Sequence, residues 1–268
     1  MLAARAAADV RAVFREQLEY RELLVQMVRR DLLLRYKQTV MGFGWAIFMP
    51  LVNTAIFSIV FTRIAPIDTG LPYPLYAYSG LLAWNFMAAS LRFAVTSLTS
   101  NANLVTKIYF PREIFPFAAV VVSLVDAAIG ATVLIALMAW YGVFGGWTML
   151  LLPLVVAVHV MFTAGVALLL AMSHLFFRDV KYLFDIVVSV AMFATSVVYP
   201  IERVGGLTGR ILALNPVNAI IDAYRAVLLR GELPPAGPLA FAAVFSAVLL
   251  LGAWIAFHRG ELTFAENM

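Results

Sequence analysis

The 268-residue chain contains no cysteine. It can therefore form no disulfide, thiolate metal site or cysteine nucleophile, and redox and cysteine chemistry are excluded as functions. Charged residues are also scarce, at 13% of the chain against about 25% in soluble domains. Because 63% of the residues are hydrophobic, a water-soluble protein of this size could not bury so much apolar surface. The composition predicts an integral membrane protein, whose apolar residues the bilayer solvates.

Several chemical motifs are missing as well. The sequence has no G-x-x-x-x-G-K-[ST] phosphate loop, so we expect no nucleotide hydrolysis by this chain itself. It has no HExxH motif or other clustered metal-ligand set. No basic run alternates with exposed aromatic residues, which argues against nucleic-acid binding despite the net charge of +4. An excess of Lys and Arg in a membrane protein more often reports its orientation.

Long stretches without Asp, Glu, Lys or Arg predict an all-α fold with six membrane-spanning helices. Each stretch approaches or exceeds the roughly 20 apolar residues that cross about 30 Å of hydrocarbon. The third and fourth spans share one apolar run, divided by Tyr-Gly and Gly-Gly pairs at 141–142 and 145–146. The expected spans are 42–62, a helix from about residue 75 to beyond 92, the two halves of 114–177, 182–199 and 238–257.

These spans divide the chain into three parts: a cytoplasmic interface helix within 1–41, a transmembrane domain at 42–257 with an external helical segment at about 200–237, and a cytoplasmic tail at 258–268. Fourteen of the 19 lysines and arginines fall on the side of the N-terminus, and five on the other side. The positive-inside rule therefore predicts that both termini are cytoplasmic. The first forty residues carry eight basic side chains and no early hydrophobic core, so we expect no signal peptide.

Residues 10–37 have the pattern of an amphipathic helix that does not cross the membrane. Its apolar face is expected either to lie in the inner headgroup layer or to pack on a partner. In the first case its basic residues would face anionic lipid. Those residues are Arg29, Arg30, Arg35 and Lys37.

A segment rich in Gly and Pro follows Tyr199 and contains a second amphipathic helix. Asn215 is expected to cap this helix and Pro216 to begin it. Apolar residues with helical spacing, among them Tyr224, would form one face, and the polar residues, among them Arg225, would face elsewhere. The helix is expected either to act as a re-entrant or gating element or to cover the outside of the bundle.

Two short inward segments mix aromatic and charged residues, as docking surfaces do. An alternative is interface anchoring, with rings at headgroup level and cations that extend toward water. The residues expected to form a docking surface are Lys107, Tyr109, Phe110, Arg112 and Glu113 in the first segment and Phe177, Arg178 and Asp179 in the second.

Ionisable residues within the spans are few, namely Asp126, His159 and, near an inner end, His174. A proton- or sodium-coupled carrier is expected to hold several in a relay, and an intramembrane enzyme needs convergent carboxylates or His and Arg. The pattern argues against both. Asp126 is either functional or paired with a neighbouring helix.

Aromatic residues are plentiful, and most must face lipid or pack between helices. A subset could line a channel, since aromatic rings can stack on the apolar faces of sugars. The channel candidates are Trp45, Phe48, Trp84, Phe86, Phe193 and Tyr199.

A set of short motifs along almost the whole chain resembles one known family. They are Arg-Tyr-Lys-Gln-Thr-Val-Met-Gly at 35–42 with Trp45 and Pro50, Asn-Leu-Val-Thr-Lys at 103–107, Phe-Pro-Arg-Glu at 110–113, Phe-Arg-Asp-Val at 177–180, Tyr-Pro at 199–200, Leu-Asn-Pro at 214–216 and the tail at 261–264. Their identity and order resemble the permease subunit of polysaccharide-exporting ABC transporters, the type-2 (ABC-2) exporters of lipid-linked O-antigen and teichoic acid.

The resemblance implies a homodimer in a bacterial inner membrane with two copies of a separate ATPase. ATP and Mg would bind that ATPase, and this chain would hold no cofactor. The inward loops would act as coupling helices on the ATPase, the outer helices would cap the channel, and an undecaprenyl-linked polysaccharide would cross to the outer leaflet. Two other classes stay open, an exporter of drugs or other lipids from the same superfamily and a membrane enzyme of glycan assembly.

Overall fold

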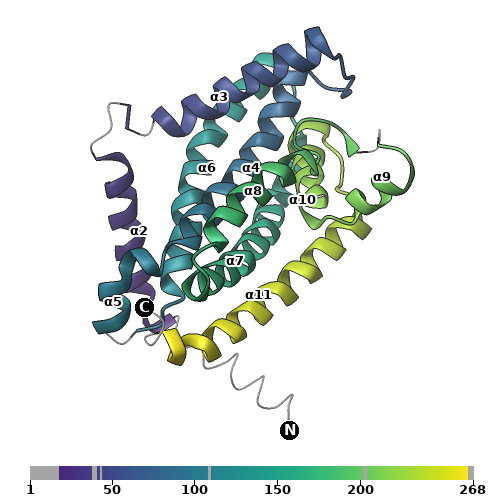
Figure 1. Ribbon diagram of the computed structural model, residues 1–268. Coiled ribbons are helices and arrows are strands. Elements are labelled where there is room, and N and C mark those ends of the chain that lie inside the picture. Colours follow the sequence, from purple (N-terminus) through teal and green to yellow (C-terminus); the bar gives the residue numbers. More distant parts are fainter. Residues whose placement is uncertain (1–17, 38–40, 43, 108–109, 202–203, 265–268) are drawn as a thin grey trace.

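The computed structural model describes residues 18–37, 41–42, 44–107, 110–201 and 204–264, and this part of the chain is helical without any strand (Figure 1). The all-α prediction is confirmed. The α-helices are α2 (Arg21–Tyr36), α3 (Gly44–Ile59), α4 (Tyr73–Val95), α5 (Ala102–Lys107), α6 (Ile114–Tyr141), α7 (Leu152–Phe176), α8 (Val180–Phe193), α9 (Gly206–Ala213), α10 (Pro216–Arg225) and α11 (Ala236–Phe264).

The membrane-spanning capacity of these helices matches the sequence pattern in most places. Four helical segments in the described part are long and apolar enough to cross a bilayer, or up to six if each of two bent helix pairs counts as one span. The first and second predicted spans correspond to α3, which continues as a π-helical turn to Ile64, and to α4. The third and fourth predicted spans are α6 and α7. Gly142 ends α6 with a φ of 66°, a backbone conformation that glycine adopts without strain.

The fifth predicted span differs from the prediction. Helix α8 has 14 residues, or about 21 Å at 1.5 Å per residue, and is too short to cross about 30 Å of hydrocarbon alone. The chain leaves the helix after Phe193 and continues in turns instead of reaching Tyr199. The carbonyls of Ser196 and Val197 in these turns accept hydrogen bonds from Arg225 rather than from the next helical turn. A side chain from α10 therefore holds the turns that follow α8.

Helix α4 forms the centre of the bundle. It packs against α3, α6, α7 and α8, and 17 of its 23 residues are buried. Helix α11 packs along α7 and crosses beneath the bundle in Figure 1. This arrangement leaves α3 and α8 with one face on α4 and large apolar residues exposed on the other.

The N-terminal helix α2 packs along α6 within the same chain. Near its end, Arg35 forms an ion pair with Asp126 of α6, and the Tyr36 hydroxyl donates a hydrogen bond to the same carboxylate. The guanidinium of Arg35 also lies 3.9 Å from the centre of the Phe93 ring. The expectation that Arg35 faces anionic lipid is therefore wrong, and Asp126 has the paired role. Residues 10–17 of the predicted helix lie outside the described residues.

Candidate functional site

Helix α10 begins as the sequence predicts. Asn215 precedes it, and its side-chain oxygen accepts a hydrogen bond from the backbone N–H of Val217 at 3.0 Å. Pro216 occupies the first turn, where its missing N–H costs no helical hydrogen bond. The helix continues as a π-helical turn to Arg230, and its axis is bent by 79° from that of α9. This is the geometry of a broken span or a re-entrant loop.

Arg225 is the most deeply buried cation of this helix, with 1% of its surface exposed. Its guanidinium donates to the Tyr76 hydroxyl at 2.9 Å and to the carbonyl of Val197 at 2.7 Å. It also approaches the Asp222 carboxylate to 3.4 Å. The sequence pattern placed Arg225 away from the apolar face of the helix, and the structure corrects this. The side chain points into the bundle, where polar groups of α4 and of the turns after α8 accept its hydrogen bonds.

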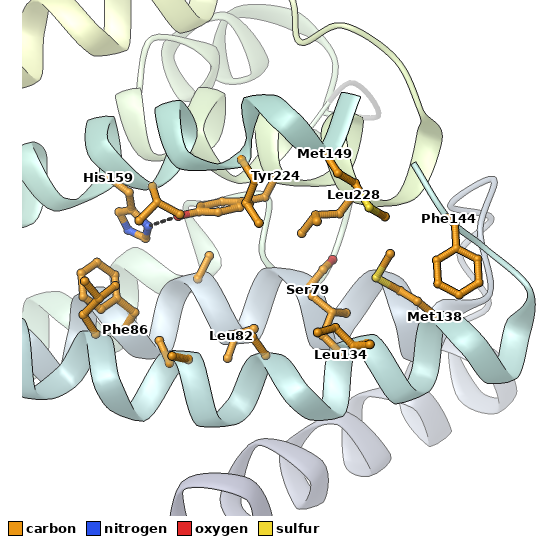
Figure 2. Close-up of a pocket in the computed structure, with 18 residues that line it drawn as sticks. Ser79, Leu82, Phe86, Leu134, Met138, Phe144, Met149, His159, Tyr224 and Leu228 are labelled. Carbon is orange, nitrogen blue, oxygen red and sulfur yellow. Dashed lines mark hydrogen bonds between the residues drawn. The ribbon is translucent and has the colours of Figure 1, made fainter. Parts of the chain in front are cut away.

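An apolar cavity of about 650 Å³ lies beneath α10, between α4, α6 and α7 (Figure 2). Its polar side chains include a pair, with the Tyr224 hydroxyl 3.4 Å from Nδ1 of His159. The Phe86 ring packs edge-to-face on His159 with 4.9 Å between ring centres. His159 therefore pairs with a residue of α10, and Tyr224, expected only as part of a gate helix, lines this cavity.

The predicted channel aromatics do not share one surface. Trp84 and Phe86 are buried in the core around α4, so neither is exposed on a sugar-stacking channel surface as predicted, and Phe86 instead borders the apolar cavity. Trp45 and Phe48 are exposed together on α3, with ring centres 5.9 Å apart. The two remaining aromatics, Phe193 and Tyr199, lie at the end of α8 and in the turns that follow. Phe193 is exposed, and the hydroxyl of half-buried Tyr199 donates to the Phe193 carbonyl.

The first inner segment is anchored to the end of α11. Phe110 is 4% exposed and Glu113 is fully buried, so the expectation that these two side chains lie on an exposed docking loop is wrong. Arg112 donates its backbone N–H to the Glu261 carboxylate at 3.1 Å and its guanidinium to the carbonyls of Glu261 and Val105. The side chains of Lys107 and Tyr109 lie outside the described part.

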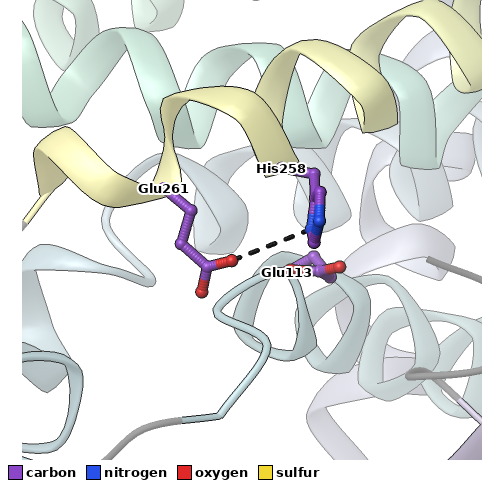
Figure 3. A group of neighbouring side chains, drawn as sticks. All are labelled: Glu113, His258 and Glu261. Carbon is purple, nitrogen blue, oxygen red and sulfur yellow. Dashed lines mark ion pairs between the residues drawn. The ribbon is translucent and has the colours of Figure 1, made fainter. Parts of the chain in front are cut away.

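Glu113, His258 and Glu261 form a cluster that the sequence pattern did not reveal (Figure 3). Their potential ligand atoms lie within 4.8 Å of one another, a spacing that could hold a cation. Neighbouring Arg112 already lies 3.9 Å from Glu261, and Trp254 donates to Glu113 at 3.1 Å. An ion-pair network that attaches the inner segment to α11 accounts for these contacts. His258 and Glu261 lie one helical turn apart on α11, but Glu113 precedes His258 by 145 residues (258 − 113), so no local motif marks the cluster.

The second inner segment is free of such packing. Phe177 is 69% exposed, and Arg178 and Asp179 are exposed beside it, as expected for a docking surface. A cavity of about 320 Å³ adjoins them and is lined in part by His174 and Lys181. This surface can present an apolar ring and a basic rim to a partner.

Comparisons with known proteins assign the family. Residues 22–229 match the family model described as ABC-2 type transporter. The chain is 30% identical over 257 residues to the O-antigen export system permease protein RfbA of Myxococcus xanthus, covering 95% of this chain and 98% of the relative. It is 27% identical over 214 residues to the protein of the same name from Klebsiella pneumoniae, covering 79% of this chain and 82% of the relative. This multi-pass membrane protein therefore belongs to the ABC-2 type transporter family.

Proposed function

We propose that the chain is the transmembrane subunit of an exporter of lipid-linked, O-antigen-like polysaccharide. The observation that carries this proposal is the 30% identity along 95% of the chain to a relative named as an O-antigen export permease. This similarity covers nearly the full length of both proteins. The cargo class is taken from the names of the relatives.

The energy source in this proposal is a separate ATPase, present in two copies on a homodimer of this chain. The absence of a phosphate loop from the sequence supports a separate subunit. The exposed segment from Phe177 to Asp179 is the part of the inner surface best suited to dock it. The first inner segment would transmit the resulting movement to α11 through Arg112 and Glu261, because these residues join the two elements.

The proposed location is the bacterial inner membrane, with both termini in the cytoplasm. The excess of Lys and Arg on the segments that share a side with the N-terminus supports this orientation. Helices α9 and α10 would then lie at the outer face, and α5 and the α7–α8 connection at the inner face.

The test is complementation of a strain that makes a lipid-linked O-antigen but lacks the permease that exports it. Co-expression of this chain with a separate ABC-type ATPase subunit is expected to restore surface polysaccharide, measured with an antibody on intact cells. The matched controls are the chain alone and the chain with an ATPase whose phosphate-loop lysine is replaced. Restored efflux of an apolar drug without any surface polysaccharide would instead favour a small-molecule exporter.

A further inference from the structure

The apolar cavity beneath α10 has a floor and a mouth of different exposure. Ser79 and Phe86 of α4 and His159 of α7 form the floor and are buried. At the mouth, Ile135 of α6 is 60% exposed and Phe144 of the following turn is 58% exposed. The cavity therefore opens near Ile135 and Phe144 and is closed toward α4, where Ser79 and Phe86 line it with His159 and Tyr224 (Figure 2).

The length of the cavity along α6 exceeds one half of the hydrocarbon core of a bilayer. Its α6 wall runs from Leu124 to Met138, or about 21 Å along the helix at 1.5 Å per residue. One half of the hydrocarbon core measures about 15 Å. Both α6 and α7 are candidate spans, so the surroundings of the mouth are hydrocarbon. A cavity that runs along a membrane-spanning helix is oriented roughly parallel to lipid chains.

The chemistry of the walls selects an apolar ligand. Among the described residues that line the cavity, none is charged. The Ser79 hydroxyl donates to the Tyr76 carbonyl of its own helix, and the Tyr224 hydroxyl lies beside His159. The rest of the surface is aliphatic or aromatic carbon and methionine sulfur. Apolar cavities do not hold water, and an empty one loses dispersion contacts along its whole lining.

We propose that this cavity is a binding site for one fatty-acyl chain of a membrane phospholipid. None of the described residues that line the cavity is cationic, so the site recognises the hydrocarbon chain and not a phosphate group. Phospholipid acyl chains are the most abundant hydrocarbon chains in the bilayer, and one of them therefore occupies the site. The bound chain contacts Tyr224 and Leu228 and thereby supports the outer helix from below. The proposal is independent of the exported cargo.

The test uses the full chain in cell membranes together with its ATPase. A phospholipid with a diazirine near the end of one acyl chain is photo-crosslinked, and the labelled residues are mapped by mass spectrometry. We expect labelling concentrated on Phe86 and Tyr224 inside the cavity relative to Trp140, which is exposed on α6 outside the cavity. Equal labelling of Trp140 and the cavity residues would overturn the proposal.

Two variants of one helix sharpen the test. Ala131 lines the cavity, and Ala136 is exposed on α6 without lining it. Ala131→Trp is expected to lower labelling of the cavity about tenfold, because displacing a few methylene groups removes enough burial for that change. Ala136→Trp is expected to leave it unchanged. If Ala131→Trp does not accumulate in membranes, Ala128→Phe at the mouth takes its place with the same expectation.

Two further experiments test whether another molecule occupies the cavity. A diazirine-bearing polyprenyl phosphate that labels the cavity while the phospholipid does not would overturn the proposal in favour of the exported lipid. Efficient disulfide formation between two copies of the Ala131→Cys variant would overturn it in favour of a second copy of this chain. The second experiment has no background from other disulfides, because the natural sequence has no cysteine.

Discussion

The guanidinium carbon of Arg225 lies 3.5 Å from the centre of the Tyr76 ring, and one of its nitrogens donates to the hydroxyl of the same tyrosine. One arginine thus joins α10 to the central helix α4. The Val197 carbonyl, bound by the other nitrogen, adds the turns after α8 to the same junction. A buried cation held by this many partners leaves several polar groups unpaired if it is removed.

The first prediction follows from that junction. Arg225→Met is expected to destabilise the protein by about 3 kcal/mol or more, because the carbonyls of Ser196 and Val197 lose their donor inside the bundle. The measurement is thermal unfolding of the purified protein in detergent. The matched control is Arg230→Met, which removes an exposed pair with Glu232 and is expected to change stability by less than about 1 kcal/mol. Equal effects of the two variants would contradict the assigned role of Arg225.

The second prediction concerns the glycine that permits this contact. A Cβ on Gly80 would lie 2.4 Å from the Val197 carbonyl oxygen and 2.5 Å from an Arg225 nitrogen. Gly80→Ala is therefore expected to lower the unfolding temperature and the amount of protein in membranes. Gly252→Ala in α11 meets nothing within 4 Å and is expected to be neutral or to stabilise by about 0.5–1 kcal/mol. A neutral Gly80→Ala variant would show that the close approach is not required.

The third prediction concerns the attachment of α2. Burial and the neighbouring Asp126 raise the pKa of Tyr36 to about 12, so its hydroxyl stays protonated and remains a donor to that carboxylate. Asp126→Asn weakens the bonds to Tyr36 and Arg35, and proteolysis at the arginines of α2 is expected to accelerate about tenfold. Asp185→Asn, which removes an exposed pair with Arg92, serves as the control with little expected change.

A charge exchange extends this test. The double variant Arg35→Asp with Asp126→Arg is expected to recover part of the resistance to proteolysis lost in either single variant. Strict additivity of the two single effects would argue that the pair does not hold α2 on α6.

The fourth prediction separates docking from packing in the inner segments. Phe177→Ala is expected to leave the unfolding temperature unchanged but to reduce recovery of the ATPase with the tagged permease, because the ring is exposed. Phe110→Ala is expected to cost about 3–5 kcal/mol of stability, because its ring is buried. The docking assignment fails if the Phe177→Ala variant retains the ATPase as well as the natural chain does.

The fifth prediction tests orientation with single cysteines in intact cells. Cysteines in place of Arg210 and Arg230, both exposed, are expected to react with a membrane-impermeant maleimide. Cysteines in place of Lys37 and Arg178 are expected to react only after the membrane is permeabilised. Labelling of the second pair but not the first in intact cells would invert the proposed topology. A cysteine in place of Arg225 is expected to stay unlabelled in both conditions, because the site is buried.

The sequence by itself determined the class of protein, most of the helices and the family resemblance. These properties follow from the overall composition and from short stretches of sequence. Examples are the length of the apolar stretches, the glycines that interrupt them and the helix start at Asn215 and Pro216, none of which depends on how the helices pack together. The Phe-Pro-Arg-Glu and Phe-Arg-Asp motifs in their order also belong to the sequence alone. All of them could be predicted before any helix was placed beside another.

Tertiary structure decided which polar residues have partners and where α8 ends. Helical periodicity assigned Arg225 to a polar face, yet in a bundle a cation can be buried if distant carbonyls and a tyrosine surround it, and no local spacing reports those partners. The same reason applies to Asp126 with Arg35 and to Glu113 beside Glu261, where the partners are brought together by helix packing. Trp84 and Phe86 became core rather than channel residues because α4 lies at the centre of the bundle, covered by its neighbours.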